Sequence, residues 1–177
     1  MKKLIIFIMV LTTILMGCGV SQPIQPIPPA PPTTYETIWS GKVSITIETP
    51  STEGGTVIDI NTPGRGNVEA TKISTMNGGE WDETTNTWEL SIPRGDTASL
   101  GIQLKNTGGD FTTVYTYISN ANPALGVKLN AITDNMKGEV VIPSGETRWV
   151  DFGVLVSTEA PLGTSLDDIE LAIRSNP

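Results

Sequence analysis

Residues 92–109 read IPRGDTASLGIQLKNTGG, and this stretch decides the fold class. In its centre three aliphatic residues, Leu100, Ile102 and Leu104, are separated by single small or polar residues. Successive side chains of a β-strand point to opposite faces of the sheet, so this alternation predicts a strand with one buried face. A Pro-Arg-Gly sequence precedes the strand and Asn-Thr-Gly-Gly follows it, and both are typical of turns.

The same alternation recurs in other parts of the chain. Residues 43–47, 150–156 and 169–173 each carry apolar side chains at every second position, and turn sequences rich in Gly, Pro and Asn separate them. Residues 166–173 could also be read as a short helix, but their apolar residues alternate from Ile169 onward. Short strands with frequent turns predict an all-β domain, either a sandwich or a barrel.

The order of the turns narrows this prediction. A Pro-x-Gly-acidic sequence occurs at residues 93–96 and again at 143–146, and Ala-Pro-Leu-Gly at 160–163 precedes the last strand. This succession resembles the immunoglobulin-like domains of bacterial and archaeal surface proteins of the cell-adhesion-related type. The resemblance covers roughly residues 88–177 and implies an immunoglobulin-like antiparallel β-sandwich. An unrelated sandwich that uses the same favoured turns is the alternative, and turn motifs say little about function.

The region before this domain also has strand character. Residues 35–87 are expected to add N-terminal β-strands that pack on the sandwich or extend it, or to form a small subdomain against it. Trp81 and Trp88 flank a polar turn, which predicts a hairpin in which the two indoles pack across the strands.

The first residues of the chain have the pattern of an export signal. Lys2 and Lys3 precede an apolar run of about a dozen residues at 4–15. This run is shorter than the roughly 20 residues that span a bilayer, but it has the length of the apolar region of a signal peptide. We therefore predict a signal peptide at residues 1–17.

The sequence Leu15-Met16-Gly17-Cys18 ends this segment and resembles the lipobox of bacterial lipoproteins. The resemblance implies cleavage before Cys18, acylation of the Cys18 sulfur and a lipid bilayer as partner. Met16 is larger than the residue usual at its position. An ordinary signal peptide, or a membrane anchor, with an incidental cysteine is the alternative.

Residues 18–34 are predicted to link the anchor to the domain. The segment SQPIQPIPPAPPTT at 21–34 contains six prolines, which lack a backbone N–H and exclude both helix and sheet. Such a segment favours an extended, disordered stalk that would reach roughly 40 Å. A peptide ligand for a proline-binding module is the alternative.

Composition excludes several classes of function. The net charge of −8 argues against a nucleic-acid partner, because phosphates would be repelled. The chain has no histidine and one cysteine, so the commonest general base, thiolate metal sites and disulfides are excluded. We predict no catalytic residue, no cofactor and no metal site. Asp167 and Asp168 are adjacent, so within a strand their carboxylates should point to opposite faces, which disfavours general acid–base catalysis. A calcium site that uses Asp167 or Asp168 with loop carbonyls is the alternative.

The aromatic residues are the remaining candidates for a binding site. Trp149, Tyr115 and Tyr117 each lie at the opposite parity from the aliphatic residues of their strands, which predicts an outward-facing aromatic surface. Core and hairpin packing is the alternative for any single tryptophan. The sequence thus predicts a membrane-anchored, extracytoplasmic, non-enzymatic module that binds an envelope protein or glycan, or serves structurally. An accessory polysaccharide- or solute-binding module for a separate enzyme or transporter is the second hypothesis.

Overall fold

The structure is a computed structural model, and it describes residues 35–48, 56–60, 67–133 and 138–175. The chain divides into two units, Met1–Pro32 and Thr33–Pro177, and all the described residues belong to the second. The predictions for the signal peptide, Cys18 and the proline-rich stalk lie outside the described residues.

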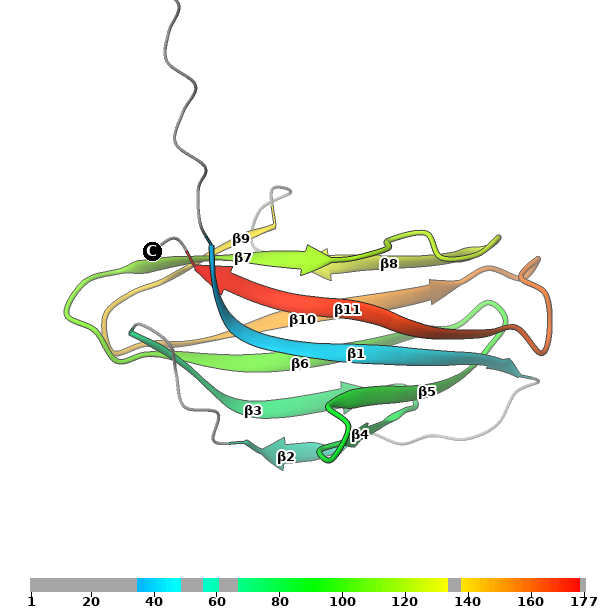
Figure 1. Cartoon of the computed structure of the whole chain (residues 1–177), viewed down its shortest axis with the longest axis horizontal. Coiled ribbons are helices and arrows are strands. Elements are labelled where there is room, and N and C mark those ends of the chain that lie inside the picture. The colour runs from blue at the N-terminus through cyan, green and yellow to red at the C-terminus, as the bar shows by residue number, and fades with distance from the viewer. Residues whose placement is uncertain (1–34, 49–55, 61–66, 134–137, 176–177) are drawn as a thin grey trace, which may run out of the picture. The chain divides into compact units, whose positions relative to one another are not determined.

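The described part of the chain forms two β-sheets packed as a sandwich, with no helix (Figure 1). This confirms the predicted immunoglobulin-like all-β fold. Sheet A has the strand order β4 (Glu80–Asp82), β5 (Thr87–Pro93), β1 (Glu36–Glu48), β11 (Ser165–Ser175), β7 (Thr112–Ile118) and β9 (Glu139–Ile142). Sheet B has the order β2 (Val57–Asp59), β3 (Val68–Met76), β6 (Thr97–Asn106), β10 (Thr147–Val156) and β8 (Val127–Ile132).

All but one of the strand pairs in the described part of the chain are antiparallel. β1 and β5 run parallel, with Lys42 opposite Thr87 and Glu48 opposite Pro93. A parallel pair needs a long connection between its strands, and the chain between β1 and β5 supplies it by contributing β2 and β3 to sheet B.

The predicted boundary at residue 88 is not a structural boundary, because it falls inside β5. β1 lies in the interior of sheet A between β5 and β11, and β3 pairs with β6 in sheet B (Figure 1). The strands before residue 88 therefore belong to both sheets of the same sandwich.

The core contains the alternating residues that the sequence identified. In each predicted strand the apolar set faces the opposite sheet and is almost completely buried. These residues are Val43, Ile45, Ile47, Leu100, Ile102, Leu104, Val150, Phe152, Val154, Val156, Ile169, Leu171 and Ile173. Residues 166–173 lie within β11, so the helical alternative for this segment is wrong.

The three Pro-x-Gly sequences form turns. Each has its glycine at positive φ, between 73° and 82°. Glycine adopts this conformation without steric cost, which explains its place in the motif. In the turn before β6 the Asp96 N–H donates to the Pro93 carbonyl, and Glu146 donates to Pro143 in the same way before β10.

The strand faces can be tested at β6. Ile102→Ala is expected to lower the free energy of unfolding by about 2–5 kcal/mol, because the substitution loses apolar contacts and leaves a cavity. Gln103 is half-buried and its Oε1 accepts a hydrogen bond of 3.0 Å from Thr71 Oγ1, so Gln103→Ala should cost about 1 kcal/mol. Urea denaturation measures both variants, and equal losses would contradict the assigned faces.

Candidate functional site

The predicted aromatic residues do not form one surface. Trp149 lies on β10 of sheet B and is 41% exposed, whereas Tyr115 and Tyr117 lie on β7 of sheet A. All three point away from the core, but the outer faces of the two sheets are opposite sides of the sandwich. Parity along a strand reports only that a side chain points outward, so it could not show that these residues belong to different sheets.

The two tyrosines already contact other parts of the domain. Tyr115 packs edge-on against Tyr35, with ring centroids 5.6 Å apart. The Arg174 guanidinium lies 3.9 Å from the centroid of the Tyr117 ring, within the range of a cation–π interaction. These contacts give the tyrosines a structural role: Tyr117 contacts β11 of sheet A, and Tyr115 contacts Tyr35, which directly precedes β1.

Trp149 and Asp151 converge on the outer face of sheet B. Asp151 is the cross-strand partner of Gly101. A Cβ atom at Gly101 would lie 2.6 Å from Asp151 Oδ1 and 3.2 Å from Trp149 Cε3. Glycine at this position therefore allows the indole and the carboxylate to lie flat against the sheet.

A second glycine, Gly153, lies under another side chain on the same face of sheet B. A Cβ atom at Gly153 would lie 2.8 Å from Asn130 Oδ1, so the Asn130 amide covers Gly153 as Trp149 covers Gly101. We call Trp149, Asp151, Asn130 and the two glycines the Trp149 surface. It combines an exposed aromatic ring with side-chain oxygens that accept hydrogen bonds.

Asp151 is the unusual member of this surface. Its carboxylate is partly buried and forms no hydrogen bond or ion pair with any other described residue. Burial raises the pKa of Asp151 above its usual value, because desolvation penalises the charged form. Asp151 shares the parity of Trp149 on β10, but no motif in the sequence marks it as part of a site. Gly101 and Asn130 come from neighbouring strands that only the fold brings together.

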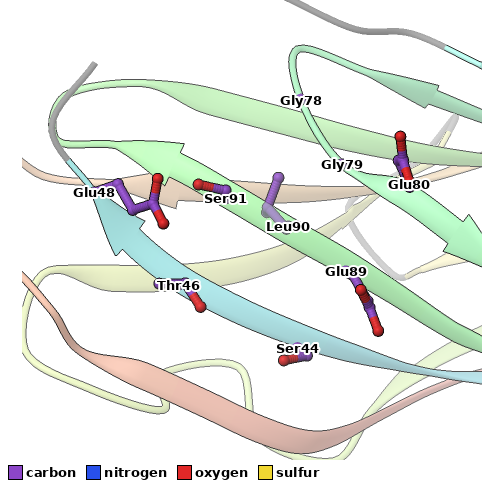
Figure 2. Close-up of a pocket in the computed structure, with 9 residues that line it drawn as sticks. All are labelled: Ser44, Thr46, Glu48, Gly78, Gly79, Glu80, Glu89, Leu90 and Ser91. Carbon is purple, nitrogen blue, oxygen red and sulfur yellow. The ribbon is translucent and has the colours of Figure 1, made fainter. Parts of the chain in front are cut away.

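The outer face of sheet A carries a wide polar groove of about 530 Å³ (Figure 2). We call it the acidic groove. Glu80 and Glu89 are direct cross-strand partners in it, an arrangement of like charges that weakens a hairpin. Its carboxylates favour a cationic ligand. None of the described residues that line it is aromatic, so it has no ring to orient a ligand. Its lining residues are Ser44, Thr46, Glu48, Gly78, Gly79, Glu80, Glu89, Leu90 and Ser91.

The adjacent aspartates on β11 have structural partners. Asp168 has a positive φ of 61°, and the pairing of β1 with β11 shifts register at this point. The sequence expectation that the two carboxylates point to opposite faces is therefore wrong. Ser44 Oγ donates a 2.6 Å hydrogen bond to Asp167, and Lys42 forms an ion pair with Asp168. The hydrogen bond and charge of Lys42 lower the pKa of Asp168.

The other tryptophans are buried. Trp81 and Trp88 are cross-strand partners in the β4–β5 hairpin, as the sequence predicted. The Asp82 carboxylate accepts hydrogen bonds from Thr85 Oγ1 and the Thr84 N–H in the hairpin turn, and these bonds lower its pKa. Asp82 therefore stabilises the turn.

No protein-family model, curated protein or solved structure matches this chain. In the described part of the chain, no group of three or more His, Cys, Asp or Glu residues is arranged to hold a metal ion. None of the segments described here is a helix with the length and apolarity needed to cross a bilayer.

Proposed function

We propose that this chain is an exported, lipid-anchored protein whose β-sandwich binds a ligand outside the cytoplasm without catalysing a reaction. The anchoring part of the proposal rests on the sequence from Lys2 to Cys18. The binding part rests on the Trp149 surface.

The observation that carries the binding proposal is the pairing of an exposed indole with an unpartnered carboxylate. A partly buried carboxylate without a hydrogen bond loses part of its hydration, and no protein hydrogen bond compensates for this loss. A ligand that stacked on Trp149 and donated an O–H or N–H to Asp151 would supply the missing bond. An envelope glycan or a segment of an envelope protein has this chemistry. The same chemistry would serve an accessory module that delivers a polysaccharide or solute to a separate enzyme or transporter.

The sheet edges support a binding role over assembly through strand pairing. β2 and β4, which end the two sheets on one side, have three residues each, and β9 has four. The longest edge strand is β8, and its Val127 and Leu129 N–H groups donate to the Ala124 and Ala121 carbonyls. Short or covered edges discourage pairing with another chain.

The Trp149 surface can be tested by substitution. Trp149→Ala should weaken capture of the ligand at least about tenfold, as expected for loss of a central aromatic contact. It should change the free energy of unfolding by no more than about 1 kcal/mol, because the ring lies on the outer face of sheet B and not in the core. The full chain, purified in detergent, would be incubated with envelope polysaccharide and with immobilised envelope proteins, and retention would be measured with thermal unfolding.

Tyr117→Ala is the matched control, because Tyr117 is similarly exposed on the opposite face. It should leave capture unchanged. Equal loss of capture in both variants would contradict a site at Trp149. A loss of about 3–5 kcal/mol of stability in Trp149→Ala would show that the indole is a packing residue, and the binding proposal would fail.

A further inference from the structure

A separate cavity of about 220 Å³ opens between the two sheets beside β2 and the β4–β5 turn. It shares no residue with the Trp149 surface or the acidic groove. β1, β3 and β4 supply its apolar wall, and β2 and the hairpin turn supply its polar groups. The lining residues are Trp39, Asp59, Ile60, Ile73, Trp81, Glu83 and Asn86.

The apolar wall is built around two tryptophans. The Trp39 and Trp81 ring centroids are 5.7 Å apart and the rings are tilted by 39°. A Cβ atom at Gly41 would lie 2.5 Å from Trp81 Cη2 and 2.9 Å from Trp39 Cζ2. Gly41 thus lets both indoles pack against β1. Trp39 also stacks with Phe152 of sheet B, which holds its ring in place.

The polar side of the cavity is acidic. Glu83 is exposed and forms no ion pair with another described residue, whereas Asp59 pairs with Lys72 at 3.1 Å. None of the described residues that line the cavity is basic. Pockets for drug-sized ligands have volumes of roughly 300–1,000 Å³, so this smaller cavity matches one side chain or a group of similar size.

We propose that this cavity, the indole pocket, receives a single arginine or lysine side chain of a partner protein. Such side chains place an apolar stem against apolar surface and keep the charged group at a polar edge. The stem would contact the small parts of Trp39 and Trp81 that reach the cavity, since both side chains are otherwise buried. The charged group would donate hydrogen bonds to Glu83, which forms no ion pair with another described residue, and charge-assisted bonds of this kind are the stronger ones. The net charge of −8 favours the approach of a cationic partner.

The proposal can be tested with small probes on the full chain in detergent. N-acetyl-arginine methylamide and N-acetyl-lysine methylamide would be titrated while the tryptophan indole N–H signals are followed by NMR. The Trp149 signal is assigned with Trp149→Phe. Both probes should shift indole signals other than that of Trp149. N-acetyl-citrulline methylamide, a neutral analogue of the arginine probe, should bind at least about tenfold more weakly, because the charge-assisted hydrogen bonds are lost.

Two glutamate variants distinguish binding in the indole pocket from nonspecific attraction of a cationic probe to the acidic protein. Glu83→Gln should weaken binding of the arginine probe by about three- to tenfold. Glu89→Gln removes the same charge from the acidic groove and should change the affinity by less than about twofold. Equal binding of the citrulline probe, equal losses in the two variants, or a shift confined to Trp149 would each overturn the proposal. These readouts do not involve the Trp149 ligand, so they are independent of the proposed function.

Discussion

Replacing Cys18 with serine is expected to abolish incorporation of labelled palmitate and to move the protein from the membrane fraction to the soluble fraction. Cys18 is the only cysteine in the chain, so no other thiol can carry an acyl chain. Two or three acyl chains hold a protein firmly on a bilayer, whereas one chain binds only marginally. Metabolic labelling followed by fractionation of the cells measures both effects.

Met16→Ala is the matched control for this experiment. It places a small residue at the one lipobox position where this sequence departs from the usual pattern, and it leaves Cys18 unchanged. Labelling should persist in this variant. If the natural protein takes up no palmitate, or if Cys18→Ser remains in the membrane fraction, the prediction of a lipid anchor is wrong.

Replacing Trp88 with alanine is expected to lower the free energy of unfolding by about 3–5 kcal/mol. Trp88 is completely buried and lies opposite Trp81 in the β4–β5 hairpin. Truncation would remove the largest fully buried side chain of the core and leave a cavity between the sheets. Natural domains are stable by about 5–15 kcal/mol, so chemical denaturation should show a large part of the stability lost.

Trp88→Phe gives a more detailed test of the same site. The Trp88 Nε1 atom is buried and has no hydrogen-bond partner among the described residues. An unsatisfied buried donor costs about 1–3 kcal/mol, and phenylalanine has no such donor. We therefore expect Trp88→Phe to be clearly more stable than Trp88→Ala. Equal losses in the two variants, or a loss below about 1 kcal/mol for alanine, would contradict this account of the core.

The strands that could be predicted are those whose signal is local. Leu100, Ile102 and Leu104 are buried because the chain alternates around them, and the glycines of the Pro-x-Gly sequences adopt positive φ in the turns. The pairing of Trp81 with Trp88 was also predictable, because a short polar turn joins their strands.

The features that could not be predicted depend on segments far apart in the sequence. β1 and β5 pair in parallel because the chain between them places β2 and β3 in sheet B, and no local pattern in the sequence shows this. The register shift at Asp168 follows from the alignment of β11 with β1, and it turns both aspartates toward solvent. The indole pocket combines residues of β1, β2, β3 and the β4–β5 hairpin, which no sequence spacing connects.

The sequence by itself determined the strands with regular alternation, which include most of β1, β6, β10 and β11, together with their buried faces and the turns beside them, because alternation and turn conformation depend on neighbouring residues. It also identified Trp149 as an outward-facing residue. Only the tertiary structure decided that Trp149 shares its surface with Asp151, Gly101 and Asn130 and lies on the opposite face from Tyr117. The physical reason is that the order of the strands is set when the apolar inner faces of the two sheets pack against each other. This packing depends on contacts between segments that are far apart in the sequence.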